Sequence, residues 1–463
     1  MPVIPRRAAL LVLGIGLAAL GVASLGEAGE SPLVEQPLVE QPLPPPVATS
    51  PFVAADGVPA RFALGINEAV AVPQKLLREG HFETASLAEH LERDAQRTAG
   101  LGARLTRGNN GAFPRTSWWA SLHEPGAREE TDLWVRTVQA RGLEPVLMVS
   151  PWPGNRTANV TLTYVPADMG AYTAWVGTVV ERYDGDGVDD MPGLTSPVRY
   201  WEVDNEPDLK FTVPPRDATR DVPPGSFCSP AEAATVLVAT AKAIRDASPE
   251  AKVLNGGLYR PFAASGQAYL RDLLAIPGVL DAFDILSLHS YASDEHGDAY
   301  ARGLRESRVL AQGKPIFVTE TSVASEGEER WMSPEWQARM VASAVGRGAV
   351  EGARAVFWHT LADPPVVGRR SGFERHSLLV GARDGGATEK PAAVVYRNLA
   401  ARLAEDDLSG ATQDGEGAAR LRSGATLLYE GTRASPTGGV DLRDGTRIPA
   451  GGTATAPAWL WPV

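Results

Sequence analysis

The chain has 463 residues, of which 44% are hydrophobic and 22% are charged, so it can bury a large core and is neither disordered nor fibrous. Its net charge of −12 argues against nucleic acid and anionic membranes as partners. The single cysteine, Cys228, excludes a disulfide within the chain, and its neighbours include no recognisable base that would activate it. We therefore expect an inert structural thiol.

The N-terminal residues have the pattern of an export segment. Arg6 and Arg7 precede an apolar run over residues 8–25, and small residues follow it. We predict a signal peptide over residues 1–28. An uncleaved membrane anchor is the alternative, because a run of this length lies at the lower limit for a membrane span. Residues 29–57 repeat the pentapeptide Pro-Leu-Val-Glu-Gln and are rich in proline, which is typical of an extended linker. The expected location is therefore secreted, periplasmic or at the cell surface.

From residue 62 onward, short apolar segments alternate with longer segments of helical periodicity. We predict strands over residues 62–67, 103–106, 145–149, 198–203, 252–255, 283–289, 315–320 and 354–358. Their starts lie 31 to 54 residues apart, which leaves room for a crossover helix after each strand. Eight such units predict an α/β fold, a closed (β/α)8 TIM barrel, over residues 58–405.

The last segment, residues 406–463, differs in pattern. Short strand-like runs are separated by glycine-rich turns. Such a segment is marginal as an independent core, so we predict a small β-rich element packed on the barrel. Trp459 and Trp461 are candidates for a sugar-binding platform, but we expect them to be buried against the barrel instead.

Two of the predicted strands end in a glutamate. The first is Glu206, in Trp201-Glu-Val-Asp-Asn-Glu-Pro207, and the second is Glu320, which follows Phe317-Val-Thr. A charged side chain at the end of a buried strand costs free energy unless it is paired or used. The carboxyl ends of barrel strands carry the active site, and two facing carboxyl groups can hydrolyse a glycosidic bond. The sequence therefore predicts a glycosidase.

These segments resemble the signature of glycoside hydrolase clan A, and among its members most resemble families 39 and 5. The resemblance spans about residues 58–405. It rests on Asn205-Glu206-Pro207, Thr319-Glu320, the Leu-His289-Ser-Tyr291 run after the sixth strand, and Trp358 at the end of the eighth. It implies a retaining (β/α)8 glycosidase with its acid/base on the fourth strand and its nucleophile on the seventh. By this match Glu206 is the expected acid/base and Glu320 the expected nucleophile, which requires their carboxyl groups to lie about 5–5.5 Å apart.

Five further residues are expected to bind the substrate or to support the glutamates. Asn205 would donate to the sugar 2-hydroxyl, and Tyr291 would hold Glu320 ionised. His289 would contact a sugar hydroxyl or orient the glutamate pair. Trp358 would form the floor of the subsite for the reacting sugar. Arg104 resembles the second-strand arginine of the clan, and its charge would lower the pKa of Glu320.

Strand alternation raises a question at the fourth strand. Glu202 and Asp204 have the parity of Glu206, so a regular strand would aim three acids at the barrel axis. Either Asp204 also lies in the site, or the strand end is bulged. We expect Glu202 to pair with Arg104 inside the barrel.

The leading hypothesis is an exported retaining glycosidase that acts on a β-linked oligo- or polysaccharide without a metal or other cofactor. A membrane tether through the N-terminal segment is compatible with either function. One alternative function is a catalytically inactive barrel that binds glycans at the cell surface. The two glutamates, accompanied by Asn205 and Tyr291, favour the enzyme. A metal-dependent barrel hydrolase is a further alternative, but the seven histidines show no pair on the early strands.

Overall fold

The computed structural model describes most of the chain after residue 56. The described residues are 57–67, 87–108, 116–123, 126–151, 164–208, 228–259, 261–291, 297–327, 332–363, 375–381 and 386–463. The predicted signal peptide and nearly all of the predicted linker lie outside them. Among these ranges, no helix combines the length and the apolar character that crossing a membrane requires.

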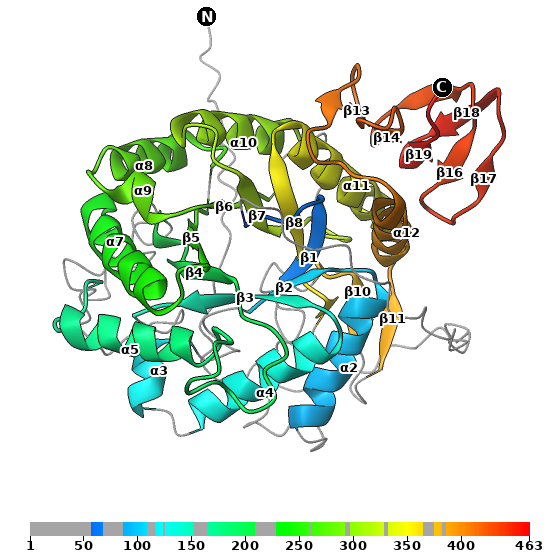
Figure 1. Ribbon diagram of the computed structural model, residues 1–463. Coiled ribbons are helices and arrows are strands. Elements are labelled where there is room, and N and C mark those ends of the chain that lie inside the picture. Colours follow the sequence, from blue (N-terminus) through cyan, green and yellow to red (C-terminus); the bar gives the residue numbers. More distant parts are fainter. Residues whose placement is uncertain are drawn as a thin grey trace, which may run out of the picture.

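Eight parallel strands form the centre of the molecule in the order β5-β4-β3-β2-β1-β8-β7-β6 (Figure 1). The strands are β1 (Ala63–Asn67), β2 (Leu105–Arg107), β3 (Glu144–Val149), β4 (Tyr200–Asn205), β5 (Lys252–Gly257), β6 (Leu286–His289), β7 (Ile316–Thr321) and β8 (Ala353–His359). Parallel bridges from Leu254 to Ile285 and from Leu258 to Leu288 link the two ends of the sheet, so that it is nearly closed. The predicted TIM barrel is confirmed.

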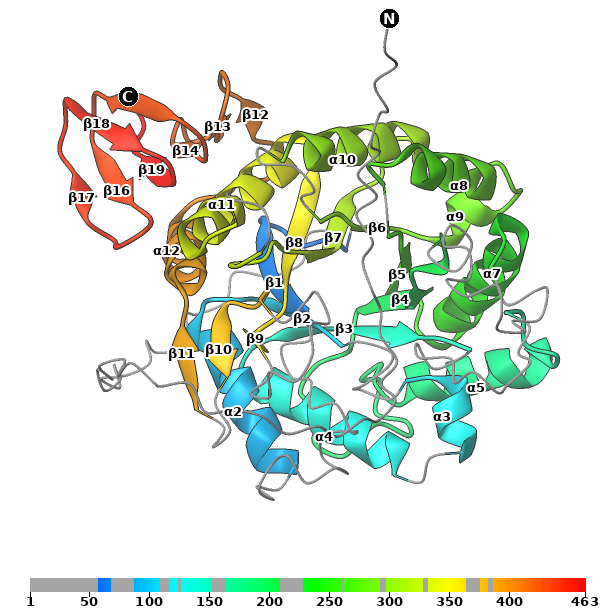
Figure 2. The ribbon, with the colours of Figure 1, turned by 180° about the vertical axis from the view of Figure 1, so that it is seen from behind.

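Helices surround the strands and follow them in chain order (Figures 1 and 2). The helices are α2 (Leu87–Gly100), α3 (Trp118–His123), α4 (Ala127–Ala140), α5 (Met169–Glu181), α7 (Pro230–Ala247), α8 (Ala264–Leu274), α9 (Val279–Ala282), α10 (Asp298–Leu310), α11 (Pro334–Val350) and α12 (Pro391–Glu405). Local sequence fixes several of their starts. Ser229 and Glu232 form a capping box at α7, and Pro230 occupies a first-turn position where its missing N–H costs nothing.

The core has an inner and an outer layer. The inner layer fills the barrel with inward-facing side chains from the strands and from Ile285, which directly precedes β6: Ala63, Leu105, Val146, Tyr200, Leu254, Ile285, Phe317, Ala355 and Phe357. The outer layer lies between strands and helices. In β8, Ala355 and Phe357 face inward, whereas Val356 and Trp358 belong to the outer layer. Because side chains alternate along a strand, the last residue of β8, His359, faces the barrel axis.

Small sheets follow the barrel. Strands β9 (Ala362–Asp363), β10 (Leu379–Gly381) and β11 (Ala387–Glu389) form one sheet. After α12, a six-stranded sheet and a two-stranded sheet contain β12 (Thr412–Gln413), β13 (Ala418–Arg420), β14 (Thr426–Leu428), β15 (Thr432–Ser435), β16 (Gly439–Asp441), β17 (Arg447–Ile448), β18 (Gly452–Thr455) and β19 (Ala458–Leu460).

This C-terminal β-element lies outside the ring of helices, beside α11 and α12 (Figures 1 and 2). Gly346 of α11 lets the helix approach Tyr429 and Leu427 closely. Trp459 is 2% exposed, and the Arg402 guanidinium lies over the ring of Trp461. The predicted small β-element is therefore present, and its tryptophans pack inward instead of forming a platform.

Candidate active site

The carboxyl ends of the barrel strands bring a set of polar side chains together. The residues concerned are Asn67, Arg107, Asn205, His289 and His359, each the last residue of its strand, and Glu320, which is second to last in β7. Glu206 directly follows β4. All of these except Asn205, Glu206 and His359 are buried, so the charges among them have little water to screen them.

Glu206 and Glu320 face one another across this end of the barrel. One carboxylate oxygen of each and a ring nitrogen of His289 all lie within 4.8 Å of one another. The His289 Nδ1 is 2.7 Å from Oε1 of Glu206 and 3.4 Å from Oε2 of Glu320. His289 therefore joins the two glutamates, one of the two arrangements expected from the sequence.

The tautomer of His289 follows from its surroundings. Its ring is fully buried, and its Nε2 has no hydrogen-bond partner within the described residues. A buried N–H without an acceptor costs free energy, so the hydrogen belongs on Nδ1, where it donates to Glu206. Burial also lowers the pKa of His289, which keeps the ring neutral at neutral pH.

Arg107 holds the site together through one fully buried guanidinium. It donates from Nη1 to Oε1 of Glu320 at 2.8 Å and to Oδ1 of Asn67 at 3.1 Å. From Nη2 it donates to Oδ1 of Asn205 at 2.7 Å, and from Nε to Glu202. Because Oδ1 of Asn205 accepts the hydrogen bond of Arg107, the Nδ2 hydrogens of Asn205 point away from Arg107 and can donate to a substrate. The guanidinium distributes its rigid set of donors over four partners, which a lysine could not do.

Arg107 takes the place that the sequence assigned to Arg104. Arg104 precedes β2, and its backbone bonds to Leu64 and Glu144 place it at the start of the strands, at the opposite end from the glutamates. The prediction for Arg104 is therefore wrong. The expected partner of Glu202 is corrected in the same way: Glu202 pairs with Arg107.

Glu202 lies beneath the site with no exposed surface. Ser287 donates to its Oε1 at 2.5 Å, and Arg107 binds its Oε2. A buried carboxylate is tolerated only when paired and hydrogen-bonded, and Glu202 has both kinds of partner. Its contacts fix the position of Arg107, and through it those of Glu320 and Asn205.

The surroundings of Glu320 keep it ionised. Burial by itself raises the pKa of this carboxyl, but positive charge on His289 and His359, carried when these rings are protonated, lowers it. The Arg107 charge and the Tyr291 hydrogen bond, 2.5 Å long to Oε2, lower it further, to about 2. Because His289 is neutral at neutral pH, Arg107 supplies the positive charge that persists over the whole pH range. Tyr291 lies where the sequence predicted it, against Glu320.

The end of β4 is irregular, which answers the question of strand parity. Asp204 has a φ of 66° and Glu206 a φ of 48°, both in the left-handed region that costs a residue with a side chain about 1 kcal/mol or more. Asp204 turns away from the axis, and its buried carboxylate accepts hydrogen bonds from Ser150 at 2.9 Å and Tyr164 at 2.8 Å. It is thus an anchor of the strand end and does not face Glu320.

Trp358 does not form the floor of the site. It is 2% exposed, belongs to the outer core layer, and donates from Nε1 to the carbonyl oxygen of His376 at 2.9 Å. The prediction for Trp358 is wrong because the strand places its neighbour on the axis. His359 lies edge-on to Tyr291, and its Nδ1 is 2.8 Å from Nδ2 of Asn67.

Sequence reasoning missed Asn67, Arg107 and His359. One signal was available for all three, because each ends a strand at the same face of the barrel. The predicted β2 ended one residue too early, at 106, and the predicted β8 ended at 358. An error of one residue moves a side chain to the other face of the sheet.

Two groups of described residues could share a cation. The first is Glu206, His289 and Glu320, and the second is Glu181, Asp184 and Asp186 at the end of α5. In the first group, Arg107 and Tyr291 already bind both oxygens of Glu320. Chemically, the arrangement suits a carboxyl pair that can serve acid–base and nucleophilic steps. The second group is partly solvent-exposed.

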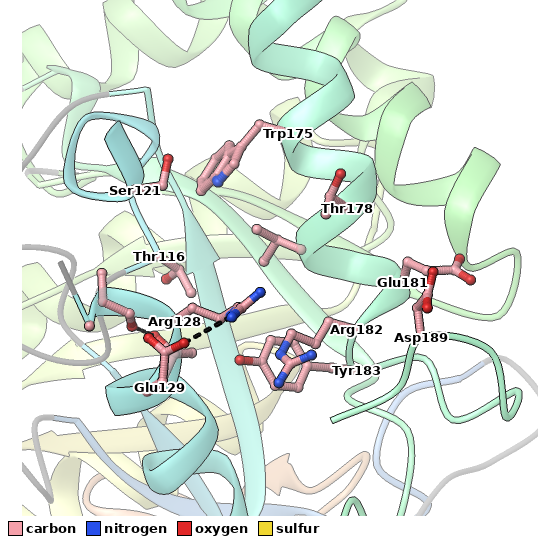
Figure 3. A pocket seen from close by; sticks show the side chains of 14 residues that line it. Thr116, Ser121, Arg128, Glu129, Trp175, Thr178, Glu181, Arg182, Tyr183 and Asp189 are labelled. Carbon is pink, nitrogen blue, oxygen red and sulfur yellow. Dashed lines mark hydrogen bonds and ion pairs between the residues drawn. The ribbon is translucent and has the colours of Figure 1, made fainter. Parts of the chain in front are cut away.

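A separate cavity of about 690 Å³ lies between α4 and α5, outside the barrel (Figure 3). Trp175 of α5 and Arg182, which directly follows α5, line one side of the cavity. On the α4 side, Arg128 and Glu129 line it and form an ion pair with each other. None of the strand-end residues lines it. The cavity is thus distinct from the candidate active site.

Comparison with known proteins finds similarity to carbohydrate-active enzymes. Residues 121–269 match the model of glycoside hydrolase family 44. No curated protein matches the sequence. A family 39 glycoside hydrolase from Bacteroides cellulosilyticus WH2 is similar in structure, with a TM-score of 0.56 and 14% identity, over 86% of this chain and 80% of that one.

Two further solved structures share the fold. A monomeric β-xylosidase from Caulobacter crescentus CB15 has a TM-score of 0.53 and 17% identity, and the match covers 81% of this chain and 73% of that one. A family 51 α-L-arabinofuranosidase from Bifidobacterium longum has a TM-score of 0.51 and 13% identity, with 87% and 95% covered. At these identities the structural likeness establishes the (β/α)8 fold.

Proposed function

We propose that the chain is a clan A glycosidase that hydrolyses the O-glycosidic bonds of a β-linked oligo- or polysaccharide with retention of configuration; the match to a glycoside hydrolase family model and the shared (β/α)8 fold support this. The observation that carries this proposal is the pair of facing carboxylates, whose oxygens lie within 4.8 Å. Retaining glycosidases place the two groups about 5–5.5 Å apart, whereas inverting enzymes need about 6.5–9.5 Å to admit a water.

The two glutamates take different roles because their surroundings differ. Glu320 is ionised, with a pKa lowered to about 2, and is the nucleophile. It attacks the anomeric carbon while the bond to the leaving oxygen breaks, and Glu206 gives that oxygen its proton. Water then attacks the glycosyl ester, Glu206 takes the proton of the water, and Glu320 is released as a carboxylate. No metal or other cofactor takes part in this scheme.

Several neighbours support these steps. Arg107 and Tyr291 hold the two oxygens of Glu320, so that the carboxylate is aimed before the substrate arrives. Asn205 presents its amide hydrogens to the 2-hydroxyl of the reacting sugar. His359, on the axis beside Asn67, lies where the floor of this subsite was expected, and presents an imidazole there in place of an indole.

The proposed substrate class rests on the chemistry of the carboxyl pair and on the solved structures that share the fold of the chain. A β-xylosidase and an α-L-arabinofuranosidase share its fold, so the barrel itself does not select one anomer. A panel of 4-nitrophenyl glycosides, with β-xyloside, β-glucoside, β-mannoside and α-L-arabinofuranoside arms, tests the choice. Turnover of the α-L-arabinofuranoside alone would contradict the β-linkage. We also propose export through residues 1–28, which N-terminal sequencing of the mature protein from culture medium or periplasm tests.

The roles of the glutamates are tested with azide. Glu320→Ala removes the group that forms the glycosyl-enzyme, so turnover should fall by several orders of magnitude on every substrate. Glu206→Ala should mainly slow substrates whose leaving group needs a proton. With an activated aryl glycoside, that variant forms the intermediate but lacks the base to release it.

Azide needs no general base, so adding it to Glu206→Ala should restore turnover and give a glycosyl azide of retained configuration, identified by NMR. An inverted azide from this variant would reverse the two roles. An absence of rescue in either folded variant would favour the glycan-binding barrel. The thermal unfolding midpoint of each variant shows whether it has folded.

A further inference from the structure

Strand β5 ends in two glycines, Gly256 and Gly257, beside the irregular end of β4. Neither has a positive φ, so freedom of the backbone is not the reason for glycine here. Both are buried. The space that a side chain would occupy is therefore the property to explain.

The space beside Gly257 is filled by the ring of His289. A Cβ added at Gly257 would lie 2.1 Å from Nε2 and 2.4 Å from Cδ2 of that ring, closer than any real contact. The ring is fully buried and is joined to Glu206 through Nδ1 at 2.7 Å. A methyl group at Gly257 must therefore push the ring, and the ring is the group that joins the two glutamates.

Gly257 also contacts the acid/base through its backbone. Its carbonyl oxygen accepts the N–H of Glu206 at 3.1 Å, next to the β4–β5 pairing of Asn205 with Gly257. The position of Glu206 is thus fixed twice by one residue. The backbone of Gly257 holds its N–H, and the absent side chain leaves room for the imidazole that holds its carboxylate.

Gly256 has a different neighbour. A Cβ there would lie 2.6 Å from the carbonyl oxygen of Val203 and 3.0 Å from that of Asp204, both on the backbone of β4. Backbone cannot yield as a side chain can. The two adjacent glycines therefore form a matched pair for substitution. A side chain at Gly256 would clash with the backbone of β4, whereas a side chain at Gly257 would clash with the imidazole of His289.

We infer that Gly257 is a positioning residue of the active site, whose missing side chain seats His289 between Glu206 and Glu320. This inference rests on the proposed function, since it gives Gly257 a part in positioning Glu206 as the acid/base and Glu320 as the nucleophile. It predicts that the effect of a side chain at 257 passes through His289 and disappears when the imidazole is absent.

A double-mutant cycle tests the inference. Gly257→Ala, His289→Ala and the double variant are assayed on the 4-nitrophenyl glycoside that the wild-type enzyme hydrolyses fastest. A shift of about 1 Å in the catalytic geometry can cost about 10²-fold, so Gly257→Ala should lower kcat/KM by about that factor. In the His289→Ala background the same change should alter kcat/KM by less than about 2-fold, so the two substitutions should be strongly non-additive, as expected for residues in contact.

The controls separate positioning from stability. Gly177→Ala, in the middle of α5 where an added Cβ meets nothing within 4 Å, should keep the activity and the thermal midpoint of the wild-type enzyme. Gly256→Ala should lower the thermal midpoint whether or not His289 is present, because its clash is with backbone. Equal losses from Gly257→Ala in both backgrounds would overturn the inference, as would full activity of that variant.

A second readout does not depend on turnover. In protein labelled with ¹⁵N-histidine, the ring signals of His289 are assigned by their loss in His289→Ala. They should move in Gly257→Ala and stay in place in Gly177→Ala. If the wild-type protein hydrolyses no aryl glycoside, the proposed function fails while these signals still decide the inference. Unmoved His289 signals in Gly257→Ala would overturn it.

Discussion

Replacing Arg107 by methionine removes the one permanent positive charge between two buried carboxylates. Glu202 has no exposed surface and Glu320 is 5% exposed, and both lose a direct partner. Removing one partner of a buried ion pair costs about 3–5 kcal/mol, because the remaining charge stays buried without compensation. We expect Arg107→Met to lower the free energy of unfolding by about that amount.

The variant should also change the pH dependence of activity. The pKa of Glu320 is about 2, below its ordinary value of 4.5, so the stability that it contributes is present above about pH 4.5 and is lost as the pH falls toward 2. Without Arg107 the pKa of Glu320 rises. The acid limb of kcat/KM should therefore move to higher pH.

Urea unfolding followed by tryptophan fluorescence and a pH–rate profile measure the two effects. Arg128→Met, which breaks an exposed pair with Glu129, is the matched control and should change neither. Adding Glu202→Gln to Arg107→Met should recover part of the lost stability, since one uncompensated charge is gone. An unshifted acid limb, or a double variant no more stable than Arg107→Met, would refute the role given to this charge.

Three further predictions concern single contacts. Tyr291→Phe removes a hydrogen bond that lowers the pKa of Glu320, so the acid limb of kcat/KM should move to higher pH. An unchanged pH–rate profile would contradict the effect of this hydrogen bond on Glu320. His359→Ala should raise KM for aryl glycosides about tenfold, equivalent to about 1.4 kcal/mol of binding. Trp358→Phe should instead lower the thermal midpoint and leave KM unchanged. The reverse pattern would show that Trp358 forms the floor of the subsite. Lys390→Met breaks a buried 2.6 Å pair with Asp363 and should cost about 3–5 kcal/mol in urea unfolding. Adding Asp363→Asn should recover much of that loss, and no recovery would show that the pair is not the cause.

The sequence by itself determined the architecture and the two central acids. Apolar runs that recur with a crossover length between them are a local signal, and eight of them predict a barrel without knowledge of any contact. Glu206 and Glu320 were found in the same way, because a charge at the end of an apolar strand stands out in the chain. Tyr291 and His289 followed from motifs only a few residues long, and the structure places both against the glutamates.

The tertiary structure decided which neighbours reach those acids. Arg107 replaced Arg104 because pairing fixes where β2 begins and ends: its last residue is set beside Asn67 of β1 and Val146 of β3. His359 replaced Trp358 for a related reason, since the register of β8 on β1 sets His359 opposite Asn67, on the axis. A shift of one residue exchanges the two faces of a strand, and local pattern does not fix a boundary that closely.

The turn at Asp204 shows most clearly the difference between what the sequence determines and what the tertiary structure decides. Alternation along β4 would aim this carboxylate at the axis, and nothing within the strand says otherwise. Ser150 and Tyr164, 54 and 40 residues away in the chain, donate hydrogen bonds to this carboxylate on the other side, where the Asp204 backbone is left-handed. Periodicity and composition are properties of neighbouring residues, so the sequence determined strands and strand ends. Register, facing and hydrogen-bond partners depend on residues that only the closed barrel brings together.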